Sequence, residues 1–152
     1  MAKSSSVGIV YPYVYPQGVD FPTRGNDPHC TLIYLGPLSD VDFTQEDVLL
    51  SLSGLDFGDI GIVDVDGLDL FGQDKDILVM RLKSSVLVDN FEAVRDRLAE
   101  KGIENASSFP DYSPHITLTE HYHGPTIGYT LPTTVGLGRP QLWWGEEVFD
   151  LG

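Results

Sequence analysis

Hydrophobic and polar residues alternate along most of the apolar stretches of this chain, which is the pattern of half-buried β-strands. The stretch His29–Leu35 is typical, and it ends at a Gly-Pro turn signal. A second strand is predicted over Val7–Val14, where Pro12 favours an edge strand or an early end. Further strands are predicted over Asp76–Lys83, His115–Glu120, Ile127–Val135 and Gln141–Leu151, and one or two over Asp59–Phe71.

Apolar residues recur at helical spacing in two places. The clearer helix is predicted over Asp89–Lys101, with Asp89 and Glu92 as a capping pair. Thr44 and Asp47 mark the start of a shorter helix. Polar loops are predicted over Pro16–Asp27 and Glu104–Pro114. Strands and helices in this order predict an α+β fold with antiparallel sheets.

The size and composition of the chain predict one ordinary globular domain. The chain has 152 residues, so residues 1–152 are expected to form a single domain. The single cysteine, Cys30, excludes an internal disulfide, so no oxidising compartment is needed. No stretch reaches the roughly 20 apolar residues of a membrane helix, and the N-terminus lacks the apolar core of a signal peptide. The expected location is the cytoplasm, with no membrane partner.

The charge of the chain narrows the choice of partners. Against 23 Asp and Glu there are only 9 Lys and Arg, a formal net charge of −14. Long nucleic acids are held mainly through phosphate contacts from Lys and Arg, so a long strand or duplex is not the expected partner. A small anionic ligand held by a few groups in a cleft remains compatible with this composition.

One five-residue pattern occurs twice in the chain. It reads Pro-His-Cys-Thr-Leu over 28–32 and Pro-His-Ile-Thr-Leu over 114–118, once in each half, and each copy lies on a predicted strand. Residues i and i+2 of a strand share a face, so His29 lies beside Thr31 and His115 beside Thr117. The alternative is that both histidines belong to ordinary strands, which the repeated context disfavours.

This arrangement suits phosphodiester cleavage. Two such strands facing each other across a cleft would enclose a phosphate between the two His-Thr pairs. One histidine would act as base on the attacking oxygen and the other as acid on the leaving oxygen, because histidine titrates near neutral pH. The threonine hydroxyls would stabilise the charged phosphoryl oxygens. No metal and no cofactor is required by this scheme, and the sequence does not say which histidine is the base.

These residues resemble the motifs of the two-histidine (2H) phosphoesterase superfamily, whose LigT-like members include RNA 2′,3′-cyclic phosphodiesterases. The resemblance extends over nearly the whole chain, and it implies a two-lobed α+β fold around a central cleft. It also implies that His29, Thr31, His115 and Thr117 are the catalytic residues. The segments that carry it are Val7–Val14, His29–Gly36, Leu70–Gly72, Phe109, Ser113–Leu118 and Gln141–Leu151.

The resemblance leaves several substrates open. Members act on RNA 2′,3′-cyclic phosphate ends, ADP-ribose cyclic phosphates, oligoadenylates and cyclic oligonucleotide signals. One branch consists of phage-encoded, anti-CBASS-type members that degrade the cyclic nucleotide alarms of bacterial immunity, and such a protein would act in the host cytoplasm. The compact length and the low content of basic residues favour a small nucleotide over structured RNA, and the expected substrate carries a cyclic phosphate or a cyclic backbone. An RNA-end enzyme and a non-catalytic module that sequesters a nucleotide are the alternatives.

Four further residues are candidates for substrate binding. Arg24 could bind a phosphate, and Phe109, Tyr112 and Trp144 could stack on a base. Packing within the protein is the competing interpretation of the aromatic residues. Strand alternation puts Tyr34 on the face opposite His29, so Tyr34 is expected in the core.

A metallohydrolase that uses His29, His115, His121 and His123 is a further alternative, because His121 and His123 resemble a pair of metal ligands. Two ligands at i and i+2 do not make a metal site by themselves. The Gly-Pro sequence that follows them favours a surface turn.

Overall fold

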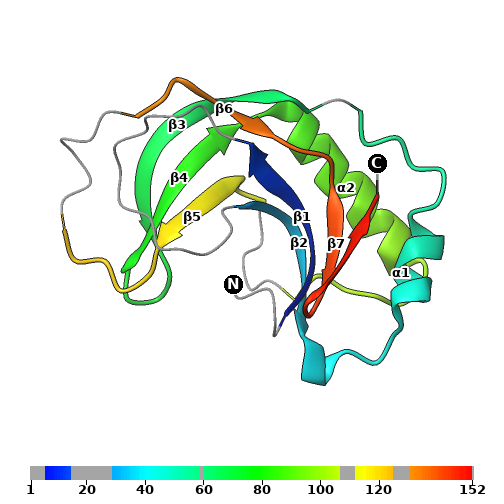
Figure 1. The fold of residues 1–152 in the computed structure, drawn as a ribbon. Coiled ribbons are helices and arrows are strands. Elements are labelled where there is room, and N and C mark those ends of the chain that lie inside the picture. Colours follow the sequence, from blue (N-terminus) through cyan, green and yellow to red (C-terminus); the bar gives the residue numbers. More distant parts are fainter. Residues whose placement is uncertain (1–5, 15–28, 59, 107–111, 125–130, 152) are drawn as a thin grey trace.

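The structure is a computed structural model, and it describes residues 6–14, 29–58, 60–106, 112–124 and 131–151. These residues form strands and helices in the mixed order that the hydrophobic pattern predicts (Figure 1). The elements are β1 (Ser6–Val14), β2 (His29–Pro37), η2 (Leu38–Asp40), α1 (Gln45–Ser51), β3 (Ile62–Phe71), β4 (Ile77–Lys83), α2 (Ser85–Ala99), β5 (His115–Thr119), β6 (Thr134–Leu137), β7 (Gln141–Trp144) and β8 (Glu147–Asp150).

The described strands make one curved sheet of eight strands, in the order β2-β5-β4-β3-β6-β1-β7-β8, with an additional pairing of β2 with β1. All of these pairings are antiparallel. The strands divide into two lobes, β8-β7-β1-β2 and β6-β3-β4-β5, which join where β2 meets β5 and where β1 meets β6 (Figure 1). The prediction of a two-lobed α+β fold with antiparallel sheets is confirmed.

Helix α2 packs against β2 and covers the outer face of the first lobe (Figure 1). Its buried apolar side chains, together with those of β1 and β2, belong to one hydrophobic core. A buried amide also connects these parts, because Asn90 Nδ2 donates to the hydroxyl of Tyr11 (2.9 Å) and to the carbonyl of Phe57 (2.7 Å). Strand β2 is therefore supported from behind by a packed layer.

The predicted N-terminus is correct for α1 and wrong for α2. Helix α1 begins with the predicted capping box, in which Thr44 and Asp47 bond each other's backbone N–H groups (3.2 and 2.9 Å). The predicted start of α2 at Asp89 is wrong. Ser84 is the N-cap, and its hydroxyl accepts from the N–H of Leu87 (3.2 Å). The buried Leu87 extends the apolar stripe by one turn, which favours the earlier start.

Pro12 does not end β1 and does not mark an edge. Strand β1 lies inside the sheet and pairs with three strands. Pro12 falls between the stretch that pairs with β7 (Val7–Val10) and the stretch that pairs with β6 (Tyr13–Val14). The missing N–H of proline is tolerated there because the sheet changes partner at that position.

The C-terminal strands also differ from the prediction. The stretch predicted as one strand, Gln141–Leu151, is the hairpin β7–β8, because Gly145 adopts a positive φ of 61° at the turn. In place of a strand over Ile127–Val135, the described part holds only the shorter β6. Residues 125–130, the loop Pro16–Asp27 and part of the loop Glu104–Pro114 lie outside the described residues. No helix in the described part of the chain is both long and apolar enough to span a membrane.

Candidate active site

The two His-x-Thr motifs lie side by side on adjacent strands. Strands β2 and β5 pair antiparallel with Cys30 opposite Ile116. Because the strands run in opposite directions, His29 lies beside Thr117 and Thr31 lies beside His115 on the same face. The expected arrangement, in which the motif strands face each other across a cleft, is therefore corrected. Strand β2 is the last strand of the first lobe, and β5 is the last strand of the second lobe. The two motif strands therefore pair where the two lobes join.

The four motif side chains line one cavity of about 810 Å³. All four are half-buried, whereas Cys30 and Ile116 between them are fully buried on the other face. This is the alternation that the sequence predicts for both strands. The volume lies in the range of small-molecule sites and exceeds the space that one phosphate group needs.

The backbone fixes the orientation of His115. Its Nδ1 lies 2.8 Å from the carbonyl oxygen of Ser113, so Nδ1 carries the proton and donates it to that oxygen. The other ring nitrogen, Nε2, is then left with a lone pair. Burial lowers the pKa of His115 below its usual 6.5, and the Ser113 bond opposes this shift only partly. A neutral imidazole with a free lone pair is suited to accept a proton.

Each motif histidine also packs against an aromatic ring. The ring of His29 lies 4.5 Å from that of Trp143, and the ring of His115 lies 4.8 Å from that of Phe71 in an edge-on arrangement. Contacts of this kind restrict how far an imidazole can turn. Sequence reasoning did not single out either aromatic residue as part of the site. Phe71 lies in a segment of the family resemblance, whereas the position of Trp143 depends on strand register.

Tyr34 lines the cavity, so its predicted place in the core is wrong. The cause is a β-bulge, in which β2 has one residue more than β1 between the pairs Thr31–Val10 and Ile33–Ile9. After the bulge Tyr34 pairs with Gly8, which shares a face of β1 with Val10. Simple alternation along β2 therefore fails beyond Thr31, and Tyr34 returns to the face of the two motifs.

Of the four predicted substrate-binding residues, Tyr112 lines the cavity in the described part of the chain. Trp144 is not among the described residues that line the cavity, and its ring lies 5.7 Å from that of Phe43. Tyr112 does line the cavity, although its hydroxyl donates to the carbonyl of Thr31 (3.0 Å). Arg24 and Phe109 lie outside the described residues.

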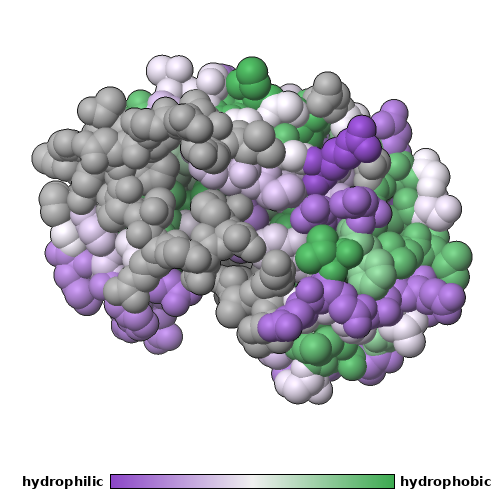
Figure 2. All heavy atoms as spheres, viewed as in Figure 1, coloured by the Kyte–Doolittle hydropathy of each residue, from purple (hydrophilic) through white to green (hydrophobic). Residues whose placement is uncertain are grey.

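The charged groups of the cavity come from β3 and from the turn between β3 and β4. Asp69 and Lys75 line it, and Lys75 is the one Lys or Arg among the described lining residues. Lys75 has a positive φ of 53°, unusual for a residue with a side chain. Hydrophilic residues lie at the lower left of Figure 2, where Figure 1 places this turn. The guanidinium group of Arg81 forms ion pairs with Asp69 (3.5 Å) and Asp66 (3.9 Å).

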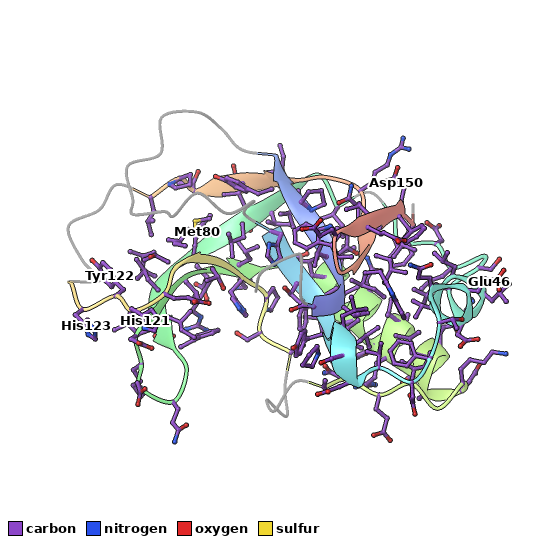
Figure 3. All side chains as sticks on the ribbon, turned by 60° about the horizontal axis from the view of Figure 1, so that its bottom comes forward. Glu46, Met80, His121, Tyr122, His123 and Asp150 are labelled. Atoms are coloured by element: carbon purple, nitrogen blue, oxygen red, sulfur yellow. The ribbon has the colours of Figure 1, made fainter. Side chains whose placement is uncertain are left out.

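His121 and His123 are not among the described residues that line the cavity. Figure 3 shows both with Tyr122 at an outer edge of the molecule, beyond the end of β5. His121 has a positive φ of 55°, and its Nδ1 lies 3.3 Å from a carboxylate oxygen of Asp76. The described part of the chain brings no three His, Cys, Asp or Glu side chains together in the manner of a metal site. The predicted surface turn is confirmed.

The family of the chain follows from its sequence together with this geometry. A family model described as "Anti-CBASS protein Acb1" matches residues 12–136, which include both His-x-Thr motifs. The chain belongs to the Acb1 family. None of the curated proteins matches the Acb1-family chain significantly.

Solved structures resemble this Acb1-family chain in fold. Escherichia coli LigT in complex with 3′-AMP is 17% identical, with a TM-score of 0.64, over 91% of this chain and 86% of LigT. Protein TT0787 of Thermus thermophilus is 16% identical, with a TM-score of 0.61, over 95% and 97% of the two chains. The MHV ns2 PDE domain is 15% identical, with a TM-score of 0.55, over 97% and 99%. These likenesses confirm the LigT-like fold.

Family and fold together confirm the membership in the two-histidine phosphoesterase superfamily that the paired motifs indicate. The Acb1-family chain is therefore a phosphodiesterase, a hydrolase of the kind that the sequence analysis expects.

Proposed function

We propose that this Acb1-family protein opens the ring of a small cyclic oligonucleotide by hydrolysing a phosphodiester bond. The pairing of Cys30 with Ile116 carries the proposal, because it collects two imidazoles and two hydroxyls on one floor of the cavity. These are the groups that an in-line displacement at phosphorus requires, one base, one acid and hydroxyl donors for the phosphoryl oxygens.

His115 is the better candidate for the base. Its Nε2 lone pair is unprotonated because Nδ1–H is bonded to Ser113 and because burial lowers the pKa of the ring. In the proposed step Nε2 takes the proton of a water molecule or of a ribose 2′-hydroxyl as that oxygen bonds to phosphorus. The bond from phosphorus to the leaving oxygen breaks, and His29, in its protonated form, gives that oxygen a proton. Thr31 and Thr117 donate hydrogen bonds to the non-bridging oxygens.

Four observations support a cyclic oligonucleotide as the substrate. The cavity volume of about 810 Å³ leaves room for more than the reacting phosphate. The family is described as anti-CBASS, and the superfamily resemblance implies that members of this branch degrade cyclic nucleotide signals. Structural neighbours include LigT complexes with 3′-AMP and with ATP, which indicates that the fold accepts small nucleotides. The net charge of −14 argues against a long nucleic acid.

The decisive experiment is product analysis by chromatography and mass spectrometry. The purified protein is incubated in chelator with cyclic di- and trinucleotides, 2′,3′- and 3′,5′-cyclic mononucleotides, oligoadenylates and an RNA with a 2′,3′-cyclic end. The His29→Ala/His115→Ala double variant is the control. The expected result is linear product from at least one cyclic oligonucleotide with the wild type and none with the double variant.

Other outcomes would separate the alternatives. Cleavage of the RNA end alone would identify an RNA 2′,3′-cyclic phosphodiesterase and overturn the proposed substrate. Stoichiometric binding with intact ligand recovered after denaturation would identify a sequestering module. Loss of activity in chelator, restored by a divalent cation, would contradict the metal-independent mechanism and favour a metallohydrolase.

A further inference from the structure

Tyr112 connects the two His-x-Thr motifs through its side chain. It lies three residues before His115 in the chain, and its hydroxyl donates to the carbonyl oxygen of Thr31 at 3.0 Å. The ring stacks on Phe91 of α2, with 4.7 Å between centroids and 4° between planes. One face of the Tyr112 ring is thus covered by Phe91, and the Tyr112 hydroxyl is hydrogen-bonded to the protein backbone.

The direction of the hydrogen bonds around Tyr112 follows from its partners. The Thr31 carbonyl is only an acceptor, so the tyrosine must donate to it. The Cys30 thiol lies 3.7 Å from the same hydroxyl, and it can donate to the remaining lone pair. Burial raises the pKa of the Cys30 thiol to about 11 and the pKa of Tyr112 well above its usual value, so both groups keep their protons. The result is a fixed chain from thiol to hydroxyl to carbonyl.

This chain anchors the segment that orients His115. Within residues 112–114, the Ser113 carbonyl accepts from His115 Nδ1 (2.8 Å) and the Pro114 carbonyl accepts from the N–H of Leu82 (2.9 Å). Both of these bonds stay within the second lobe. Of these three hydrogen bonds, only the bond from Tyr112 to Thr31 connects the second lobe to the first. The strands β2 and β5 are paired there through a single residue pair.

We propose that Tyr112 is a positioning residue, whose hydroxyl holds the Ser113 carbonyl and the Thr31 strand in register so that His115 keeps its proton on Nδ1. The inference rests on the proposed function, in which His115 Nε2 accepts a proton. It gives Tyr112 a different role from base stacking, because the side chain is engaged on its ring face and at its hydroxyl by the protein itself.

The test compares Tyr112→Phe with Tyr11→Phe. Tyr112→Phe keeps the ring and its stack on Phe91 but removes the bond to Thr31. Tyr11→Phe is the matched control, because Tyr11 pairs with Cys30 of the first motif on the neighbouring strand, and the variant removes a buried hydroxyl that accepts from Asn90 of α2. On the substrate that the wild type cleaves, Tyr112→Phe is expected to lower kcat about three- to tenfold, the range of one hydrogen bond, with KM within twofold. Tyr11→Phe should leave both constants unchanged at a temperature well below its melting point.

A second readout does not depend on activity. The ¹⁵N chemical shifts of the imidazole rings distinguish the Nδ1–H from the Nε2–H tautomer. His115 should be the Nδ1–H form in the wild type and in Tyr11→Phe, and it should gain Nε2–H form in Tyr112→Phe. If the wild type cleaves no substrate, the proposed function fails, and these shifts still decide the role of Tyr112.

Three results would overturn the inference. The first is an unchanged His115 tautomer in Tyr112→Phe together with unchanged kcat. The second is a rise in KM with kcat intact, which would indicate that Tyr112 binds substrate. The third is an equal loss of kcat in Tyr11→Phe, which would indicate a general loss of core stability.

Discussion

Cys30 lies directly opposite Ile116 where β2 pairs with β5, and both side chains are buried, with 0% and 1% of their surface exposed. The backbone of this pair sets the spacing of the flanking motif residues. Residues opposite each other in an antiparallel pair have Cβ atoms roughly 5 Å apart. A phosphate group that lies over this pair would therefore be within reach of both histidines and both threonines at once.

The first prediction concerns the two motif histidines. His29→Ala and His115→Ala should each lower kcat at least a hundredfold, because in the proposed mechanism each removes a proton-transfer group, and such groups contribute about 10²–10⁴ to the rate. Neither should change the melting temperature much, because both side chains are only half-buried. Steady-state kinetics and thermal melting measure the two effects.

His123→Ala is the matched control, because His123 is exposed and is not among the described residues that line the cavity. Figure 3 shows it at an outer edge of the molecule. It should retain wild-type kcat. Near-wild-type turnover in either motif variant would contradict the two-histidine mechanism.

The second prediction concerns pH. Burial lowers the pKa of His115, so its neutral form should persist below pH 6.5 and the acid limb of kcat/KM should have its midpoint below that value. The same shift affects stability. The pKa of His115 is near 6.5 in the unfolded chain and lower in the folded protein. Between these two values the unfolded chain binds more protons than the folded protein. The contribution of His115 to the free energy of unfolding is therefore fully present above about pH 6.5 and is lost as the pH falls toward the folded pKa.

Urea unfolding of the wild type and of His115→Gln at pH 7.5 and 5.5 measures that loss. The decrease in the free energy of unfolding on acidification should be smaller in the variant. An equal decrease in both proteins would show that His115 does not contribute to it. His123→Gln, at an exposed position, serves as the control and should behave like the wild type.

Much of the fold and of the floor of the site could be predicted from the sequence, because these features depend on short-range patterns. Strand alternation is sufficient to place His29 and Thr31 on one face, and the capping box at Thr44 is a local signal. Features set by pairing between distant strands could not be predicted. The bulge that turns Tyr34 toward the cavity arises only when β2 aligns with β1.

The choice between the two adjacent tryptophans is a second example. Their sequence says only that they point to opposite faces, and either could lie on the face of the two motifs. Register decides, because Trp143 pairs with Gly8, on the same face as the Val10–Thr31 pair. The substrate-binding role predicted for Trp144 follows from the ability of an aromatic ring to stack on a base, which both residues share, and no local signal separates the two.

The third prediction concerns Lys75. Among the described residues that line the cavity it is the one Lys or Arg, so Lys75→Gln should raise KM about two- to fivefold for a ligand that places a second phosphate near the β3–β4 turn. The increase should be smaller for a 2′,3′-cyclic mononucleotide, which has only the reacting phosphate. Added salt should reduce the difference between variant and wild type.

Lys83→Gln offers a control of equal charge change. Lys83 is exposed at the end of β4 and does not line the cavity. If both variants raise KM equally, the effect comes from net charge and not from a phosphate contact at Lys75.

The fourth prediction uses the two tryptophans as reporters. Trp143 contacts the ring of His29 at 4.5 Å, whereas Trp144 packs against Phe43. Binding of a non-hydrolysable cyclic nucleotide analogue to the protein with both motif histidines intact should therefore change the fluorescence of Trp143. Trp144→Phe should keep this change and Trp143→Phe should lose it. In the otherwise wild-type enzyme, Trp143→Phe should lower kcat/KM about two- to tenfold, the range of one aromatic contact, and Trp144→Phe should not. A fluorescence change that follows Trp144 instead would move the binding site toward Phe43 and away from the motif floor, and it would restore the base-stacking role that the sequence suggested for Trp144.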